Sequence, residues 1–406
     1  MPLKKICGHI LMAYIVMPSL LWGMTVPGHP DSQTLISSLL SRIQEQDSVL
    51  LTDPRGRILV SRHAGRLRTP ASTLKILTAL VALHYLGANY HFVTECYQDS
   101  YHNLKIRGQG DPLFTSNVMP AFAGQIADGV RQYHDLILDD TAFEHPLTIP
   151  GVTRTSEPYD APNGALCANF NTVSFKKDPA GHYVSAESQT PLLPFVAHRI
   201  QATGADAGRI VFSHSQHDST LYAGHLLNWF LSRQGVTSSG QIQMGVVQPG
   251  DRLLCRFTAP YSLSGVLSRL LEFSNNYIAN QLFITAGIRA FGPPGTMDKG
   301  IRAVQTYIHR ELKATDIQIV EGSGISKDNR ISAADMDQLL VKFYPYRGVM
   351  RRQGNESFKT GTLDGVRTRV GYIDGNGGVY RFVVMVNTPG ATADPIMEII
   401  RKIADS

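Results

Sequence analysis

The feature that most limits how this chain can fold is a set of three short motifs. Ser-Thr-Leu-Lys occupies residues 72–75, Ser-Asn-Asn residues 274–276 and Lys-Thr-Gly residues 359–361. Transfer of an acyl group from a carboxylate-bearing substrate to a serine requires a hydroxyl, an amine close to it and a second, fixed positive charge. The fold therefore has to bring three distant segments into one site.

The first motif has one competitor, because residues 174–177 also read Ser-x-x-Lys. Such a short pattern arises about once by chance in a chain of this length. Ser174 lies in a polar, strand-like stretch. Ser72 instead opens an apolar run that predicts a helix buried on all sides and ended by Gly87. Three positions apart on a helix, Ser72 and Lys75 share one face, and the start of the helix favours negative charge there. We predict that Ser72 is the nucleophile and Lys75 its base.

The other two motifs each occur once and follow Ser72 in order. Residues 274–276 lie between two helical patterns and predict a short loop that joins two helices. Residues 359–361 precede a stretch, 362–374, that predicts an edge strand, followed by a hairpin at 374–378 and a further strand. Glycine in such a strand lets a substrate backbone approach closely.

Each motif has a structural explanation when taken alone. A helical lysine usually extends its amine to solvent, Ser-Asn-Asn often caps a helix, and Lys-Thr-Gly often forms a turn. The apolar surroundings of Lys75 argue against the first explanation, since burial would lower its pKa toward that of a useful base. The ordered occurrence of all three favours a catalytic site.

At these motifs the chain resembles the class C low-molecular-mass penicillin-binding proteins, which are serine D-alanyl-D-alanine carboxypeptidases and endopeptidases of peptidoglycan. The resemblance runs from about residue 32 to the C-terminus. It also rests on further segments: 70–71, 108–112, 139–143, 321–330 and 359–366. Two features depart from the family pattern. Glu321 stands where the family usually has aspartate, and the segment 351–358 is short, which affects substrate preference more than chemistry.

The resemblance implies a mechanism. Ser72 attacks the carbonyl of the D-Ala-D-Ala bond, the terminal D-alanine leaves, and water releases the product from the acyl-enzyme. Lys75 is the implied base, Ser274 relays a proton to the leaving nitrogen, and Asn276 holds the acyl-chain amide and Lys75. β-Lactam antibiotics would acylate Ser72 as covalent inhibitors.

The third motif supplies the substrate contacts that the resemblance implies. Lys359 and Thr360 bind the terminal carboxylate, and Gly361 lets the substrate approach. The oxyanion lies between the backbone N–H groups of Ser72 and Thr362. The substrate would be a peptidoglycan stem peptide.

For the fold, we expect an α+β catalytic domain like that of serine β-lactamases and transpeptidases, with helices on both faces of an antiparallel sheet. The family implies five strands. A β-rich insertion is expected between the first and second motifs, since residues 96–250 hold short strand-like pieces broken by Gly, Pro and Asp. The expected division is a signal peptide at 1–24, a catalytic domain at 25–95 and 251–406, and an insertion at 96–250.

The N-terminus predicts export to the periplasm. Two lysines precede an apolar stretch typical of a secretory signal, although no clear cleavage site follows, which leaves an uncleaved anchor and peripheral membrane contact open. Cys96, Cys167 and Cys255 remain after processing and allow one disulfide, whose pairing the sequence leaves open.

Composition excludes several functions. A net charge of +5 suits an anionic cell wall, but no basic run interleaved with aromatics predicts nucleic-acid binding. The 14 histidines show no zinc spacing, and no glycine-rich phosphate loop occurs, so no cofactor or metal is expected. Two alternatives stay open: a β-lactamase, disfavoured because no Glu-x-x-Leu-Asn stretch supplies a deacylating base, and a penicillin-recognising sensor or scaffold without turnover.

Overall fold

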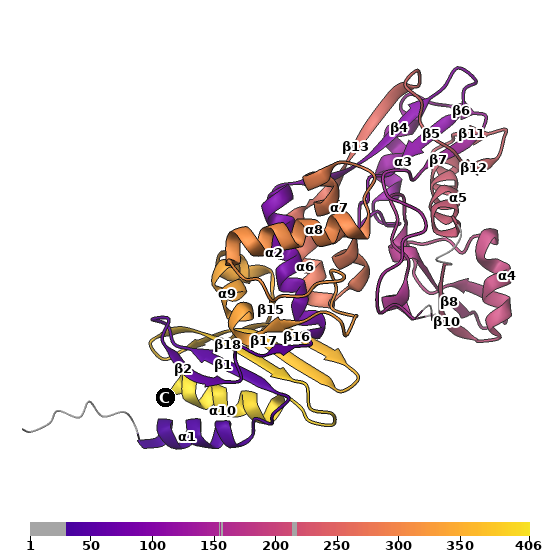
Figure 1. Cartoon of the computed structure of the whole chain (residues 1–406). Helices are drawn as coiled ribbons and strands as arrows, with labels where there is room; N and C mark the ends of the chain where they lie inside the picture. Colours follow the sequence, from indigo (N-terminus) through magenta and orange to yellow (C-terminus); the bar gives the residue numbers. More distant parts are fainter. Residues whose placement is uncertain (1–29, 154, 156, 213–216) are drawn as a thin grey trace, which may run out of the picture.

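The computed structural model describes residues 30–153, 155, 157–212 and 217–406; the predicted signal segment 1–24 lies outside them. The main sheet is antiparallel, with the strand order β15-β16-β17-β18-β1-β2 (Figure 1). Its strands are β1 (Ser48–Thr52), β2 (Ile58–Arg62), β15 (Arg351–Gln353), β16 (Glu356–Leu363), β17 (Val366–Gly375) and β18 (Gly378–Val386). The N- and C-terminal parts of the chain thus build one sheet, as predicted.

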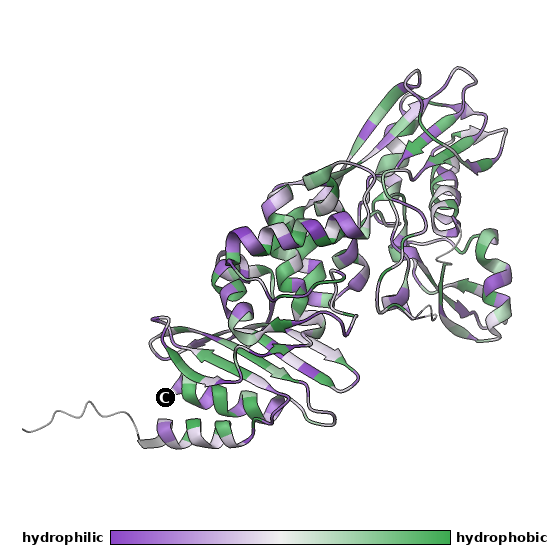
Figure 2. Cartoon of the chain, in the orientation of Figure 1, coloured by the Kyte–Doolittle hydropathy of each residue, from purple (hydrophilic) through white to green (hydrophobic). Residues whose placement is uncertain are grey.

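Helices cover both faces of this sheet, and the side chains of each strand alternate between the two cores. Val384 of β18 packs with α1 (Pro30–Ser41) and α10 (Asp394–Asp405), whereas its neighbour Val383 faces the helical region. Because both faces are buried, β18 contains an unbroken apolar run, Phe382–Val386, and the sheet in Figure 2 carries many hydrophobic, green segments. The predicted α+β fold class is confirmed.

The helical region lies between the main sheet and the insertion (Figure 1). It consists of α2 (Lys75–Leu86), α6 (Leu263–Phe273), α7 (Asn276–Phe291), α8 (Met297–Tyr307) and α9 (Ala333–Phe343). The predicted buried helix is α2, which ends at Gly87 with φ of 86°. Within the described residues, no helix combines the length and the apolar character that crossing a membrane requires.

The insertion contains a five-stranded mixed sheet in the order β12-β7-β5-β4-β13. Its strands are β4 (His91–Gln98), β5 (Leu104–Arg107), β7 (Leu136–Asp139), β12 (Ile242–Met244) and β13 (Arg252–Ser262). A smaller sheet joins β8 (Thr172–Lys177), β9 (Tyr183–Ser185) and β10 (Ala207–Val211). Short two-stranded pairs are formed by β6 (Gln132–Tyr133) with β11 (Thr237–Ser238) and by β3 (Leu67–Arg68) with β14 (Ile331–Ser332).

The described part of the insertion also contains the α-helices α3 (Met119–Ala127), α4 (Pro194–Thr203) and α5 (Asp218–Arg233). The chain passes through α3 between the parallel strands β5 and β7, as a parallel connection requires. β4 and β13 pair along their whole length, with His91 opposite Ser262 and Gln98 opposite Arg252. The sheet of the insertion therefore begins before residue 96 and ends after residue 250. We propose that the insertion spans 91–262.

Two details of the main sheet differ from expectation. The short strand β15 adds a sixth strand, at the edge where a five-stranded sheet would expose β16. The stretch 362–374 is split between two strands, β16 and β17, rather than forming one. The turn between them includes Gly365, whose φ of 72° is a conformation that glycine adopts readily. The Lys-Thr-Gly motif therefore lies within β16.

The structure also narrows the choice of cysteine pairs. Cys96 of β4 and Cys255 of β13 are directly opposite each other in an antiparallel pair. Both are thiols here, and the hydrogen bond to Cys255, together with burial, raises the pKa of Cys96 well above its ordinary value. Cys167 is buried, where Asn171 Nδ2 donates to its sulfur at 2.9 Å.

We expect Cys96 and Cys255 to form a disulfide when the purified protein is oxidised, because opposed strand positions match the Cα separation of a disulfide. The bond should stabilise the protein by about 2–4 kcal/mol. Peptide mapping without reduction should reveal a linked pair that Cys255→Ser removes and Cys167→Ser retains. Full alkylation of Cys96, Cys167 and Cys255 in denatured, unreduced protein would contradict this.

Candidate active site

Ser72 lies in a single 3₁₀ turn, Ala71–Leu74, that leads directly into α2. The preceding Ala71 has φ of 48°, a left-handed conformation that is costly for alanine. Its surroundings maintain this conformation: a Cβ on Gly324 would lie 1.9 Å from Ala71 O, so only glycine permits this contact. Thr368 Oγ1 donates to Pro70 O at 2.7 Å on the other side. The backbone of the nucleophile is held on both sides.

Lys75 is fully buried, and its Nζ makes three hydrogen bonds. The acceptors are Ser72 Oγ at 2.8 Å, Asn276 Oδ1 at 2.7 Å and Ser323 O at 2.7 Å. Burial of the amine, followed by the positive charge of Lys359, holds the pKa of Lys75 well below its ordinary value, although the carboxylate of Glu321 acts in the opposite direction. The amine is therefore suited to accept a proton.

The three contacts also orient the amine. A neutral lysine has two N–H donors and one lone pair, and the oxygens of Asn276 and Ser323 can only accept. These two oxygens fix the two N–H groups, so the lone pair is directed at Ser72 Oγ. An amine placed in this way can accept the proton of a serine hydroxyl.

Glu321 is a buried residue whose role the sequence did not reveal. Its carboxylate accepts hydrogen bonds from Ser323 N at 2.7 Å, Gly324 N at 2.6 Å and Asn329 Nδ2 at 2.7 Å. These bonds shape the turn that presents Ser323 O to Lys75. The only sequence signal was the family-like segment 321–330, in which Glu321 was noted as a departure.

The second motif connects α6 to α7, as predicted. Ser274 has φ of 54° at the end of α6, Asn275 caps α7 by accepting from Ile278 N at 3.0 Å, and Asn276 is the first residue of α7. Asn276 is thereby brought to Lys75. Among the hydrogen bonds of the described residues, none joins the Ser274 hydroxyl to Ser72 or Lys75.

The third motif lies along β16 beside the nucleophile. A Cβ on Gly361 would lie 2.8 Å from Ser72 N, so glycine allows the strand to reach the N–H of Ser72. Lys359 is almost completely buried, and its Nζ donates to Thr360 O at 2.6 Å. Burial, followed by the charge of Arg351, lowers the pKa of Lys359 to about 8. The side chains of Thr360 and Thr362 are exposed on the strand.

The competing Ser-x-x-Lys match is not part of this site. Ser174 lies in β8, where its hydroxyl donates to Glu187 Oε1 at 3.0 Å. In a strand, positions 174 and 177 point to opposite faces, so the two side chains do not converge.

A serine hydroxyl paired with a buried lysine, on this fold, defines a serine acyl-transferase of the penicillin-binding class. Comparison with known proteins agrees. Residues 44–348 match the model of the D-Ala-D-Ala carboxypeptidase 3 (S13) family, and the chain belongs to this family of serine-type peptidases. It is thus a class C low-molecular-mass penicillin-binding protein, as its motifs suggested.

Similar proteins include a D-alanyl-D-alanine carboxypeptidase from Actinomadura sp. strain R39, 27% identical over 415 residues, covering 84% of this chain and 77% of that protein. The crystal structure of penicillin-binding protein 4 from Haemophilus influenzae has a TM-score of 0.73 at 19% identity, covering 91% of this chain and 98% of that one. The structure of a predatory peptidoglycan endopeptidase from Bdellovibrio bacteriovorus has a TM-score of 0.52 at 18% identity. The match covers 88% of this chain and 90% of that one.

Proposed function

We propose that this protein is a D-alanyl-D-alanine carboxypeptidase that cleaves peptidoglycan stem peptides with Ser72 as nucleophile. The observation that carries the proposal is the 2.8 Å contact between Ser72 Oγ and the buried Lys75 Nζ, whose other two partners are carbonyl oxygens. The acyl-enzyme chemistry of this pair accounts equally for covalent inhibition by β-lactams, whose ring carbonyl replaces the peptide carbonyl.

In the first step Ser72 attacks the carbonyl of the penultimate D-alanine, and its proton passes to Lys75. The oxyanion lies between the N–H groups of Ser72 and Thr362, the latter on the strand next to the nucleophile. Ser274 then relays this proton from Lys75 to the leaving nitrogen, the peptide bond breaks and terminal D-alanine departs. Water attacks the ester and regenerates Ser72.

Substrate would bind along the outer edge of β16. Within the described strands, β15 covers this edge only opposite residues 356–358, whereas residues 359–363 pair with β17 alone. An extended peptide can add to such an edge by backbone hydrogen bonds. The ammonium of Lys359 uses one of its three N–H donors on Thr360 O, and a free carboxylate is a fitting partner for the others, together with the Thr360 hydroxyl.

Action on peptidoglycan implies export, and we place the protein in the periplasm on the strength of its N-terminal sequence. The net charge of +5 favours contact with the anionic cell wall. A similar fold is found in a peptidoglycan endopeptidase, so cleavage of cross-linked peptides is a second activity to test at the same site.

Incubation of the purified protein with muropeptides, followed by mass spectrometry, tests the function. We expect pentapeptides to lose one D-alanine; conversion of cross-linked dimers to monomers would add the endopeptidase activity. The Ser72→Ala variant is the control for contaminating hydrolases. Covalent penicillin binding without any turnover of either peptide would instead indicate a sensor, and rapid penicillin hydrolysis without peptide cleavage would indicate a β-lactamase.

Lys359→Ala is expected to lower acylation by a substrate with a terminal carboxylate about tenfold to a hundredfold, through loss of a charge-assisted hydrogen bond of about 1.5–3 kcal/mol. A thioester with no carboxylate at that position should lose much less. Lys327→Ala is a matched control, since Lys327 is an exposed lysine whose partner, Asp364, follows the same strand. An equal loss with both substrates would assign Lys359 to the chemical step.

The same lysine predicts an alkaline limit to activity. Only the protonated amine binds a carboxylate, so kcat/KM for a carboxylate substrate should fall as pH rises through about 8, the pKa of Lys359. The thioester should lack this decline. In Lys359→Arg, whose charge persists, the limit should move to higher pH. A decline at the same pH for both substrates and both proteins would refute the assignment.

A further inference from the structure

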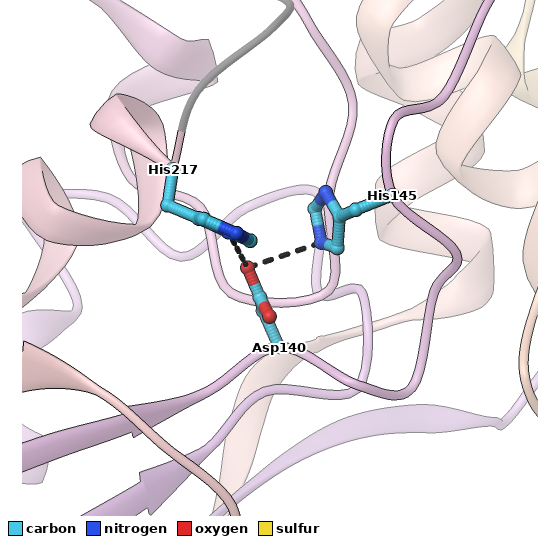
Figure 3. Close-up of side chains that lie close together, drawn as sticks. All are labelled: Asp140, His145 and His217. Carbon is cyan, nitrogen blue, oxygen red and sulfur yellow. Dashed lines mark hydrogen bonds and ion pairs between the residues drawn. The ribbon is translucent and has the colours of Figure 1, made fainter.

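A second cluster of chemically versatile side chains lies in the insertion. Asp140 directly follows β7, His145 lies five residues further along the same loop, and His217 immediately precedes α5. Figure 3 shows the two imidazoles approaching one carboxylate from different segments. Asp140 Oδ2 is 3.0 Å from His145 Nε2 and 3.1 Å from His217 Nδ1. The ligand atoms of all three residues lie within 4.8 Å of one another.

We propose that Asp140, His145 and His217 bind a zinc ion. Two imidazole nitrogens and one carboxylate oxygen form a ligand set that zinc uses, with a fourth position open for water. Zinc–ligand bonds of about 2.0–2.1 Å place tetrahedral ligand atoms about 3.3 Å apart. The two measured separations are only slightly shorter. The zinc site was not expected from the sequence, because its ligands show no motif spacing and His217 lies far along the chain from Asp140 and His145.

Hydrogen bonding explains the geometry of this cluster less well than a bound zinc ion does. Thr220 Oγ1 also donates to Asp140 Oδ2, at 3.0 Å, so three donors converge on one oxygen. A carboxylate has about two lone-pair positions on each oxygen. With zinc bound, the imidazoles turn their lone pairs to the metal, and Thr220 alone donates to the carboxylate. A ligand supported in this way is typical of protein metal sites.

The position of the site suggests what the metal does. Asp140 and His145 lie on either side of residues 142–144, which attach the insertion to the helical region. Gly295 N donates to Ala142 O at 2.7 Å, and Glu144 N donates to Gly295 O at 2.9 Å. Phe143 between them is buried in the core of the helical region. Zinc would tie both ends of this attachment to the start of α5, which gives it a structural role separate from the chemistry at Ser72.

The test uses full-length, untagged protein freed of metal by a chelator. Calorimetric titration with zinc chloride at about pH 8 should show one ion per chain and a saturable rise in Tm. Cobalt should give the intense visible absorption of a tetrahedral site. Asp140→Asn and His217→Ala should each remove or greatly weaken binding, and Thr220→Val should weaken it about tenfold to a hundredfold.

His134→Ala is the matched control. His134 is an exposed histidine of the same insertion, and its Nδ1 lies 3.3 Å from Asp135 Oδ1, but it is not one of the three clustered ligands. The His134→Ala protein should bind zinc as the wild type does. Unchanged binding in both Asp140→Asn and His217→Ala, or no binding by the wild type, would overturn the proposal.

The wild-type protein alone gives a second measurement, in case a variant folds poorly. Adding chelator to the zinc-loaded protein should lower Tm while leaving the rate of penicillin labelling at Ser72 unchanged. If Tm does not respond to either zinc or chelator, the site has no structural function. If labelling stops on chelation, the separation of this site from the chemistry is wrong.

Discussion

Ser72→Ala is expected to abolish covalent labelling of the protein by a fluorescent penicillin, with a fall in acylation of about 10⁶-fold. The substitution removes one oxygen, and that oxygen is the atom 2.8 Å from the amine of Lys75. The surrounding contacts at Ala71 and Thr368 involve backbone and other side chains, so folding should be retained. Gel fluorescence and the mass of the labelled protein measure the result.

Ser174→Ala is the control for this experiment, because it alters the other Ser-x-x-Lys match in the chain. It should be labelled as efficiently as the wild type. Label mapped to Ser174, or label that persists in Ser72→Ala, would show that the nucleophile has been misassigned.

Lys75→Arg is expected to slow acylation by about 10²–10⁴-fold, the contribution of a well-placed general base. Arginine stays protonated in proteins, so it has no lone pair with which to accept the proton of Ser72. The rate of penicillin labelling under single-turnover conditions measures the effect, and circular dichroism with Tm verifies that the variant is folded.

Lys299→Arg provides a comparison, since Lys299 Nζ also donates to two carbonyl oxygens, Gly292 O at 2.8 Å and Pro294 O at 2.7 Å. That lysine has no place in the active site, and its replacement should leave the rate unchanged. A folded Lys75→Arg protein that acylates at nearly the normal rate would exclude Lys75 as the base.

Much of the active site could be predicted because its residues form local patterns. Ser72 and Lys75 are three positions apart at the start of an apolar helix, and Lys359 and Gly361 alternate along one strand. These short-range relations follow from helix and strand geometry. The convergence of Ser72, Asn276 and Lys359 was expected only from their resemblance to a family.

The interactions that the sequence did not reveal depend on long-range contacts. Glu321 orients Ser323 O toward Lys75 through a turn that no local pattern describes. The helices α3 and α4 of the insertion were not predicted, because both are short and lie between strands. The cluster at Asp140 joins a loop to the start of a distant helix, which only the folded chain brings together.

The strand order of the main sheet has a consequence for how the chain folds during synthesis. β1 lies between β2 and β18, so residues synthesised early pair directly with some of the last. Lys75 likewise receives its partners from residues 276 and 323. The insertion has its own core and is complete once β13 has been made. During synthesis the insertion can therefore fold first, whereas Lys75 meets Asn276 and Ser323 only after the C-terminal part of the chain has been made. We expect truncated chains to lack acylating activity.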